Sequence, residues 1–187
     1  VIGPWPHIFN QSQKVGAFDY GVDAMINWDG YVCRWFDHWL KGIDNGVMGD
    51  APVHVFVMGR NQWSAEQDWP LPQTRWTKYY LHSGGHANTT SGDGALSSAP
   101  PAPGDAASDS YVYDPAMPTL SDFTSGHIED GAVDTRKSAS RPDVLVYTTP
   151  PLDEEVEVTG PITASLYAAT SARDTDWMVR LIDVQPD

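Results

Sequence analysis

The clearest periodic pattern of apolar residues runs from Asp23 to Lys41. Asp23 is suited to cap the N-terminus of a helix, and Gly42 suits the left-handed position after its last turn. Between them, apolar side chains recur at steps of three and four, as on one face of an amphipathic helix: Met25, Trp28, Val32, Trp35, Phe36, Trp39 and Leu40. The pattern predicts one helix over residues 23–41.

Two short runs rich in β-branched and aromatic residues follow this helix. The run VHVFVMG at residues 53–59 is too brief for a helix and too apolar for an edge strand. It therefore predicts a buried strand. The run WTKYYLH at residues 76–82 predicts a second strand.

Residues 83–110 differ in composition from what precedes them. Gly, Ser, Ala, Pro and Thr dominate, and Leu96 is the only large apolar side chain. Such a segment cannot build a core of its own, so we expect a long surface connection with a domain boundary before or within it.

After residue 110 the apolar residues alternate with polar ones at a period of two. This is the pattern of half-buried antiparallel strands in a β-sandwich. A jelly roll has about eight strands, more than the pattern supplies, so the predicted sandwich is partial. The segments predicted as strands are 111–115, 143–149, 156–160, 162–170 and 176–184.

The N-terminal stretch VIGPWPH places His7 after a short strand end and a Gly-Pro-Trp turn. A loop and the long helix follow, which is the order at the end of an α/β-hydrolase sheet, where the triad histidine comes last. No G-x-S-x-G nucleophile motif occurs in the sequence. The pattern alone favours a surface or capping role for His7, because a lone histidine in a proline-rich turn is more often such a residue.

Eight sequence words in this order resemble the superfamily of cocaine esterases, X-Pro dipeptidyl-peptidases and α-amino-acid ester hydrolases. Each word alone is weak, but together they cover nearly the whole chain. The words are GPWPH, WFDHWLKG, VHVFVMGRNQW, DWPLP, YVYDP, RPDVLVYTTPPL, VEVTGPI and DTDWMVRLIDVQPD.

The resemblance implies a mixed fold, with the last strand and helix of an α/β-hydrolase domain followed by a partial β-sandwich of the jelly-roll type. Residues 1–50 would end the catalytic domain, residues 51–110 would connect, and residues 111–187 would begin the jelly roll. Both ends are then expected to be cut, with exposed apolar surface at Val1, Ile2 and Val184.

The resemblance also implies roles for two residues. His7 would be the triad base of a serine hydrolase, and Trp5 would help to wall the substrate site, although packing is the alternative for Trp5. The serine, its acidic partner and the oxyanion donors match nothing in this sequence, so the chain alone is expected to be inactive. Its expected partners are the remainder of the parent chain and a small acyl ester or amide substrate.

Composition excludes several other classes of function. The chain has 25 acidic and 11 basic residues and a formal charge of −14, which disfavours binding to nucleic acid or an anionic membrane. No apolar run is long enough to span a bilayer. The lone Cys33 is interpreted as a small core residue. The sequence leaves the oligomeric state and the compartment open.

We expect no metal or other cofactor. His82 and His86 stand four residues apart, but a Ser-Gly-Gly turn separates them and no third ligand is apparent. The alternative to a hydrolase is a non-catalytic β-sandwich module that serves in packing or in carbohydrate binding, with His7 incidental.

Overall fold

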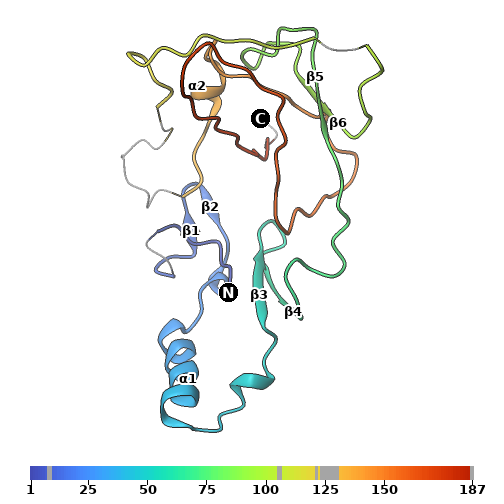
Figure 1. Ribbon diagram of the computed structural model, residues 1–187. Helices are drawn as coiled ribbons and strands as arrows, with labels where there is room; N and C mark the ends of the chain where they lie inside the picture. Colours follow the sequence, from blue (N-terminus) through green and yellow to red (C-terminus); the bar gives the residue numbers. More distant parts are fainter. Residues whose placement is uncertain (8–9, 105–106, 121, 123–130, 186–187) are drawn as a thin grey trace.

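The computed structural model describes residues 1–7, 10–104, 107–120, 122 and 131–185 (Figure 1). In this part of the chain, three antiparallel two-stranded sheets pair β1 with β2, β3 with β4, and β5 with β6. The elements are β1 (Lys14–Val15), β2 (Phe18–Asp19), η1 (Val22–Ala24), α1 (Trp28–Lys41), η2 (Val47–Gly49), β3 (Val53–Val57), β4 (Gln62–Glu66), β5 (Tyr80–His82), β6 (Ala95–Ser97) and α2 (Arg136–Ala139).

Helix α1 begins later than the apolar pattern predicted. Asn27 is its N-cap, because the Asn27 side-chain oxygen accepts a hydrogen bond of 3.0 Å from the Gly30 amide. Asp23 instead lies in the short helix η1, so its predicted capping role is wrong. The prediction for Gly42 is confirmed, since its φ of 68° is left-handed and its amide donates to the carbonyl of His38.

The apolar face of α1 is not covered in the described structure. The helix has no buried residue, and Trp39 and Leu40 are 56% and 77% exposed. Cys33 is exposed as well, so its predicted place in a core is wrong. The helical spacing was interpreted correctly, but the described elements leave most of this face exposed.

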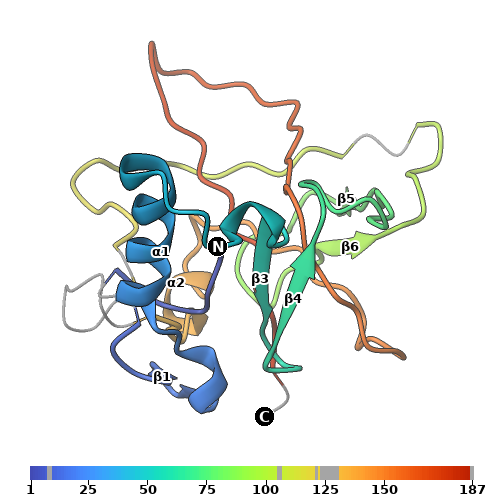
Figure 2. The same ribbon diagram turned by 90° about the horizontal axis from the view of Figure 1, so that it is seen from below.

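The hairpin of β3 and β4 holds two of the buried apolar side chains in the described residues. Its register pairs Val53 with Glu66 and Val57 with Gln62. The predicted buried strand is confirmed, because Val55 and Phe56 are only 6% and 5% exposed. Figure 2 shows the two arrows next to each other, near the N-terminus.

The second predicted strand forms only over Tyr80–His82, as β5. Its partner β6 comes from the segment that was expected to be a surface connection. That expectation is wrong for the middle of the segment, where Ala87 is fully buried. A Cβ atom added at Gly94 would lie 2.0 Å from the carbonyl oxygen of Val146, so the glycine permits a close backbone approach.

The strands predicted after residue 110 are absent from the described residues. Residues 143–149 make isolated bridges, Leu145 with Asn88 and Thr148 with Ala95. The segment from residue 150 onward is drawn without an arrow in Figure 1. The strand prediction is therefore wrong for this structure. A strand needs a neighbour for its amides and carbonyls, and the alternating pattern alone does not supply one.

The accessible surface is large for the mass of the chain. It is 14534 Å² for 20.5 kDa, whereas a compact monomer of that mass exposes about 9,000 Å². The predicted exposure of Val1, Ile2 and Val184 is confirmed at 43%, 49% and 72%. The observed fold is thus a set of small sheets, while the α/β-hydrolase and jelly-roll assignments stay predictions.

Candidate active site

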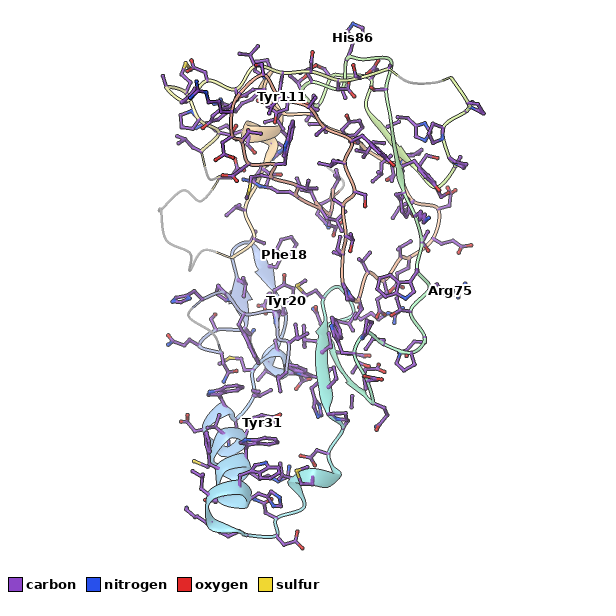
Figure 3. All side chains as sticks on the ribbon, viewed as in Figure 1. Phe18, Tyr20, Tyr31, Arg75, His86 and Tyr111 are labelled. Carbon is purple, nitrogen blue, oxygen red and sulfur yellow. The ribbon has the colours of Figure 1, made fainter. Side chains whose placement is uncertain are left out.

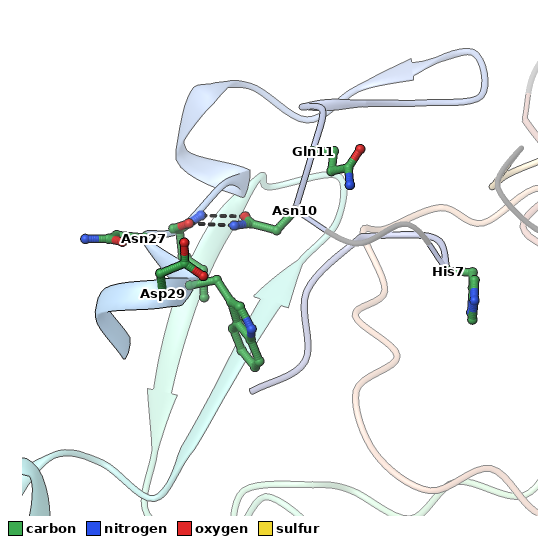
Figure 4. A pocket seen from close by; sticks show the side chains of 7 residues that line it. His7, Asn10, Gln11, Asn27 and Asp29 are labelled. Carbon is green, nitrogen blue, oxygen red and sulfur yellow. Dashed lines mark hydrogen bonds between the residues drawn. The ribbon is translucent and has the colours of Figure 1, made fainter. Parts of the chain in front are cut away.

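His7 lies exposed on the loop between Ile2 and Asn10, at the edge of an open cleft of about 600 Å³. Figure 4 shows His7 set apart from the polar side chains on the other wall. Within the described residues, no hydrogen bond or ion pair of the His7 ring is seen. The cleft is also lined by Asn10, Gln11, Ile26, Asn27, Trp28 and Asp29.

The start of the loop is fixed to the β3 edge that faces away from β4. The Ile2 amide donates to the His54 carbonyl at 2.8 Å, and the Phe56 amide donates to the Ile2 carbonyl at 2.8 Å. These two bonds form a parallel bridge between Ile2 and Val55. His7 is therefore five residues from a hydrogen-bonded strand position.

Trp5 folds back over Gly3. A Cβ atom at Gly3 would lie 2.5 Å from the Trp5 ring, so only glycine leaves room for this arrangement. The indole N–H of Trp5 donates to the Ala24 carbonyl at 2.9 Å, and its ring centroid is 5.7 Å from that of Trp63. The structure places Trp5 in packing, and its contact with a substrate stays a prediction.

The end of the loop is fixed by Asn10. Its side-chain amide donates to the Ile26 carbonyl at 2.6 Å and its side-chain oxygen accepts from the Ile26 amide at 2.8 Å. These are the two dashed bonds in Figure 4. The backbone of Asn10 has a φ of 57°, a left-handed conformation that asparagine tolerates better than most residues.

Residues 22–26 thus act as a common support for the loop, and we call them the anchor segment. They accept bonds from Trp5 at Ala24, from Asn10 at Ile26, and from the indole N–H of Trp63 at the Asp23 carbonyl, at 2.7 Å. Sequence reasoning missed Asn10 and Trp63. Asn10 belongs to no motif, and the sequence word that ends at Trp63 gave no role for this residue; both roles depend on contacts between residues 16 and 40 positions apart.

A second polar cluster, remote from His7 in sequence, is centred on Asp109. Its carboxylate accepts bonds from the Ser83 hydroxyl at 2.6 Å, the Tyr147 hydroxyl at 2.6 Å and the Ala87 amide at 2.8 Å. Burial opposes ionisation of Asp109, but the bonds from Ser83 and Tyr147 outweigh it and hold its pKa below the ordinary value. Burial, with the bond to Asp109, raises the pKa of Tyr147. We call this group the Asp109 cluster.

The other histidines do not form a metal site in the described residues. His82 contacts the Ala99 carbonyl at 2.9 Å, and His86 points outward, as Figure 3 shows, with Asp93 at 3.8 Å. Within the described ranges, no three His, Cys, Asp or Glu side chains are grouped as metal ligands would be. No helix in the same ranges is long and apolar enough to cross a membrane.

Comparison with known proteins decides the family. Residues 45–187 match the model of the X-Pro dipeptidyl-peptidase C-terminal non-catalytic domain. The chain belongs to this family. The resemblance to the superfamily of cocaine esterases and X-Pro dipeptidyl-peptidases is thereby confirmed.

Curated relatives align along the whole chain. A cocaine esterase from Rhodococcus sp. is 40% identical over 195 positions, which cover 100% of this chain and 33% of that relative. A putative serine esterase from Mycobacterium bovis is 33% identical over 100% of this chain and 28% of that relative. A putative Xaa-Pro dipeptidyl-peptidase from Bacillus anthracis is 34% identical, but over only 28% of this chain.

The chain therefore spans about a third of the length of the curated relatives that it matches end to end. The region described as non-catalytic begins at residue 45, after His7, the anchor segment and helix α1. The hairpin of β3 and β4 lies inside that region.

Proposed function

We propose that this chain is part of a longer serine hydrolase that cleaves an acyl ester or amide, and that His7 is its general base. The observation that carries the proposal is the exposed His7 ring, which lies at a cleft on a loop fixed at both ends. The large accessible surface of the chain fits a part that packs against further protein.

The proposed chemistry assigns one role to His7. Its imidazole takes the proton of a serine hydroxyl supplied by the rest of the polypeptide, as the serine oxygen attacks the substrate carbonyl. The imidazolium then returns the proton to the leaving alcohol or amine. Water then attacks the acyl group in the same way, with His7 again as the base, and the acid is released. A carboxylate from the rest of the polypeptide would orient the ring.

An ester is the favoured substrate class. The relatives that align along the whole chain are named esterases, whereas the relative named as a dipeptidyl-peptidase aligns over about a quarter of it. A direct comparison of hydrolysis rates on esters, acyl amides and X-Pro peptides would test this preference.

The alternative proposal is a non-catalytic module for packing or carbohydrate binding, with His7 incidental. The description of the matched family favours a non-catalytic role for residues 45–187. This is compatible with catalysis by His7, because His7 precedes the matched region. The two proposals differ in what loss of the His7 side chain does to turnover.

The test is hydrolysis of a nitrophenyl acyl ester by the full polypeptide. The His7→Ala variant should lose a factor on the order of 10⁴ in kcat, as removal of a triad member does. The control is His86→Ala, which removes an exposed imidazole with a single contact at 3.8 Å and should keep wild-type turnover. The 187-residue chain alone should show only the background of free imidazole.

Retention of more than about a tenth of wild-type kcat by His7→Ala, a far smaller loss than triad removal causes, would overturn the assignment. Circular dichroism of both variants would verify that the fold is kept. Because His7 is exposed, its replacement should not disturb a core.

A further inference from the structure

The hairpin of the non-catalytic region contacts the chain before His7 at two points and the anchor segment after His7 at a third. The β3 edge pairs with Ile2, the Trp63 ring lies against Trp5, and the Trp63 indole N–H bonds the Asp23 carbonyl of the anchor segment. The first two contacts precede His7 in the chain and the third follows it. The hairpin therefore supports both sides of the loop.

The Trp63 side chain touches both Trp5 and the anchor segment. The Trp63 ring also packs against Phe56, since the two ring centroids are 5.4 Å apart with an interplanar angle of 72°. Phe56 is 5% exposed, so Trp63 rests on a buried residue of β3. Edge-to-face pairs of this kind favour one relative orientation of the rings.

The Gly3-to-Pro6 turn transmits this support to His7. Two prolines restrict the backbone on either side of Trp5, because each fixes its own φ and limits the residue before it. The Trp5 ring is held over Gly3 and bonded to Ala24. Movement of the Trp5 ring would therefore shift the backbone that carries His7, two residues later.

We propose that Trp63, although it lies in the region described as non-catalytic, is a positioning residue for His7 and acts through Trp5 and the anchor segment. This inference rests on the proposed function. It assigns to the β3–β4 hairpin the task of setting where the imidazole stands relative to a nucleophile supplied by the rest of the polypeptide. A misplacement of about 1 Å can cost a hundredfold in rate.

The indole contributes in two separable ways. Its ring packs on Trp5 and Phe56, and its N–H bonds the Asp23 carbonyl. The Trp63→Phe variant keeps an aromatic ring and loses the donor, whereas Trp63→Ala loses both. The Gly3→Ala variant disturbs the same contact from the other side, because the new Cβ would collide with the Trp5 ring.

The experiment measures kcat and KM of the full polypeptide on a nitrophenyl acyl ester. Trp63→Ala and Gly3→Ala should each lower kcat by about tenfold to a hundredfold, with KM changed by less than about twofold, because misplacing the base slows the chemical step more than binding. Trp63→Phe should recover part of the loss. Trp76→Ala, which removes a tryptophan that is 67% exposed, should match wild type.

A double-mutant cycle with His7→Ala separates positioning from general stability. In the His7→Ala background, Trp63→Ala should cause no further loss of kcat, because the group that it positions is absent. An equal loss in both backgrounds, or an unchanged kcat in folded Trp63→Ala and Gly3→Ala, would overturn the inference while His7→Ala stays inactive. An active His7→Ala variant would instead overturn the proposed function.

Discussion

Strands were predicted both at β3 and within the segment from residue 150 to 185, yet only β3 forms one, paired with β4. In the hairpin a four-residue turn with Gly59 and Asn61 in left-handed conformation brings Gln62–Glu66 directly beside Val53–Val57. In the later segment Leu166 and Val179 are 44% and 59% exposed. The difference teaches that alternation specifies a face, whereas the partner strand specifies whether a strand forms.

The largest expected difference between the two regions concerns side-chain burial. Phe56→Ala should cost about 3–5 kcal/mol of unfolding free energy, because Phe56 is 5% exposed and packs against Tyr20 and Trp63. Met178→Ala, in the later segment, should stay within about 0.5 kcal/mol of wild type, because Met178 is 91% exposed.

Urea denaturation of the 187-residue chain would measure both variants. A loss of several kcal/mol from Met178→Ala would mean that residues 150–185 are packed, and the comparison would break.

An intermediate effect is expected where the later half of the chain is attached to the earlier half. Gly94→Ala would place a Cβ atom 2.0 Å from the carbonyl oxygen of Val146. The amide of Val146 also donates a hydrogen bond to the carbonyl of Ala87. The backbone must move, at a cost of about 1–3 kcal/mol. The matched control is Gly49→Ala, where a Cβ meets nothing within 4 Å.

Thermal unfolding followed by circular dichroism would compare the two glycine variants. Equal stability of Gly94→Ala and Gly49→Ala would show that residues 144–148 do not approach residues 87–94 as closely as described.

The smallest effect on stability is expected from the Asp109 cluster. Its hydrogen bonds link Ser83 and Ala87 to Tyr147, and so join the same two segments of the chain. Asp109→Asn should cost about 1 kcal/mol, near the lower end for a disturbed polar network because the site is only half-buried. The folded pKa of Asp109 is lowered, so its contribution is complete above its ordinary value of 3.8 and is lost as the pH falls through the folded value.

The contribution of Tyr147 to stability depends on pH in the opposite direction. Its folded pKa is raised, so its contribution is complete below its ordinary value of 10.0 and is lost as the pH rises above it. Unfolding curves from pH 2 to 11 should therefore lose stability at both ends in wild type and less steeply in Asp109→Asn. An unchanged pH profile in that variant would contradict the cluster.

Sequence reasoning was most accurate where local chemistry decides the structure. The left-handed Gly42 and the buried strand at Val53–Val57 follow from residue type and spacing within a few positions. The start of α1 was placed too early because Asp23 and Asn27 are both good caps, and tertiary bonds to the anchor segment favour Asn27. The eight sequence words led to the correct superfamily.

The site was predictable only in part. The role of His7 was predicted from the order of strand, turn and helix and stays a prediction, whereas the residues that support its loop could not be predicted. Trp63 and Asn10 act over 40 and 16 positions, and no local pattern distinguishes Trp63 from the other tryptophans. The individual strands predicted after residue 110 were wrong for the same reason, because strand formation depends on a partner that the pattern of one segment does not contain.

Hydrogen exchange of individual amides in the full polypeptide tests most directly the central claim, that the β3–β4 hairpin holds the His7 loop. In wild type, the amides of Ile2, Phe56 and Ile26 should be protected, since each donates a hydrogen bond that fixes the loop. In Trp63→Ala, protection at Ile2 and Ile26 should fall at least about tenfold, the equivalent of 1.4 kcal/mol, while Val146 in the other half stays unchanged. Unchanged protection at Ile2 and Ile26 would contradict the account.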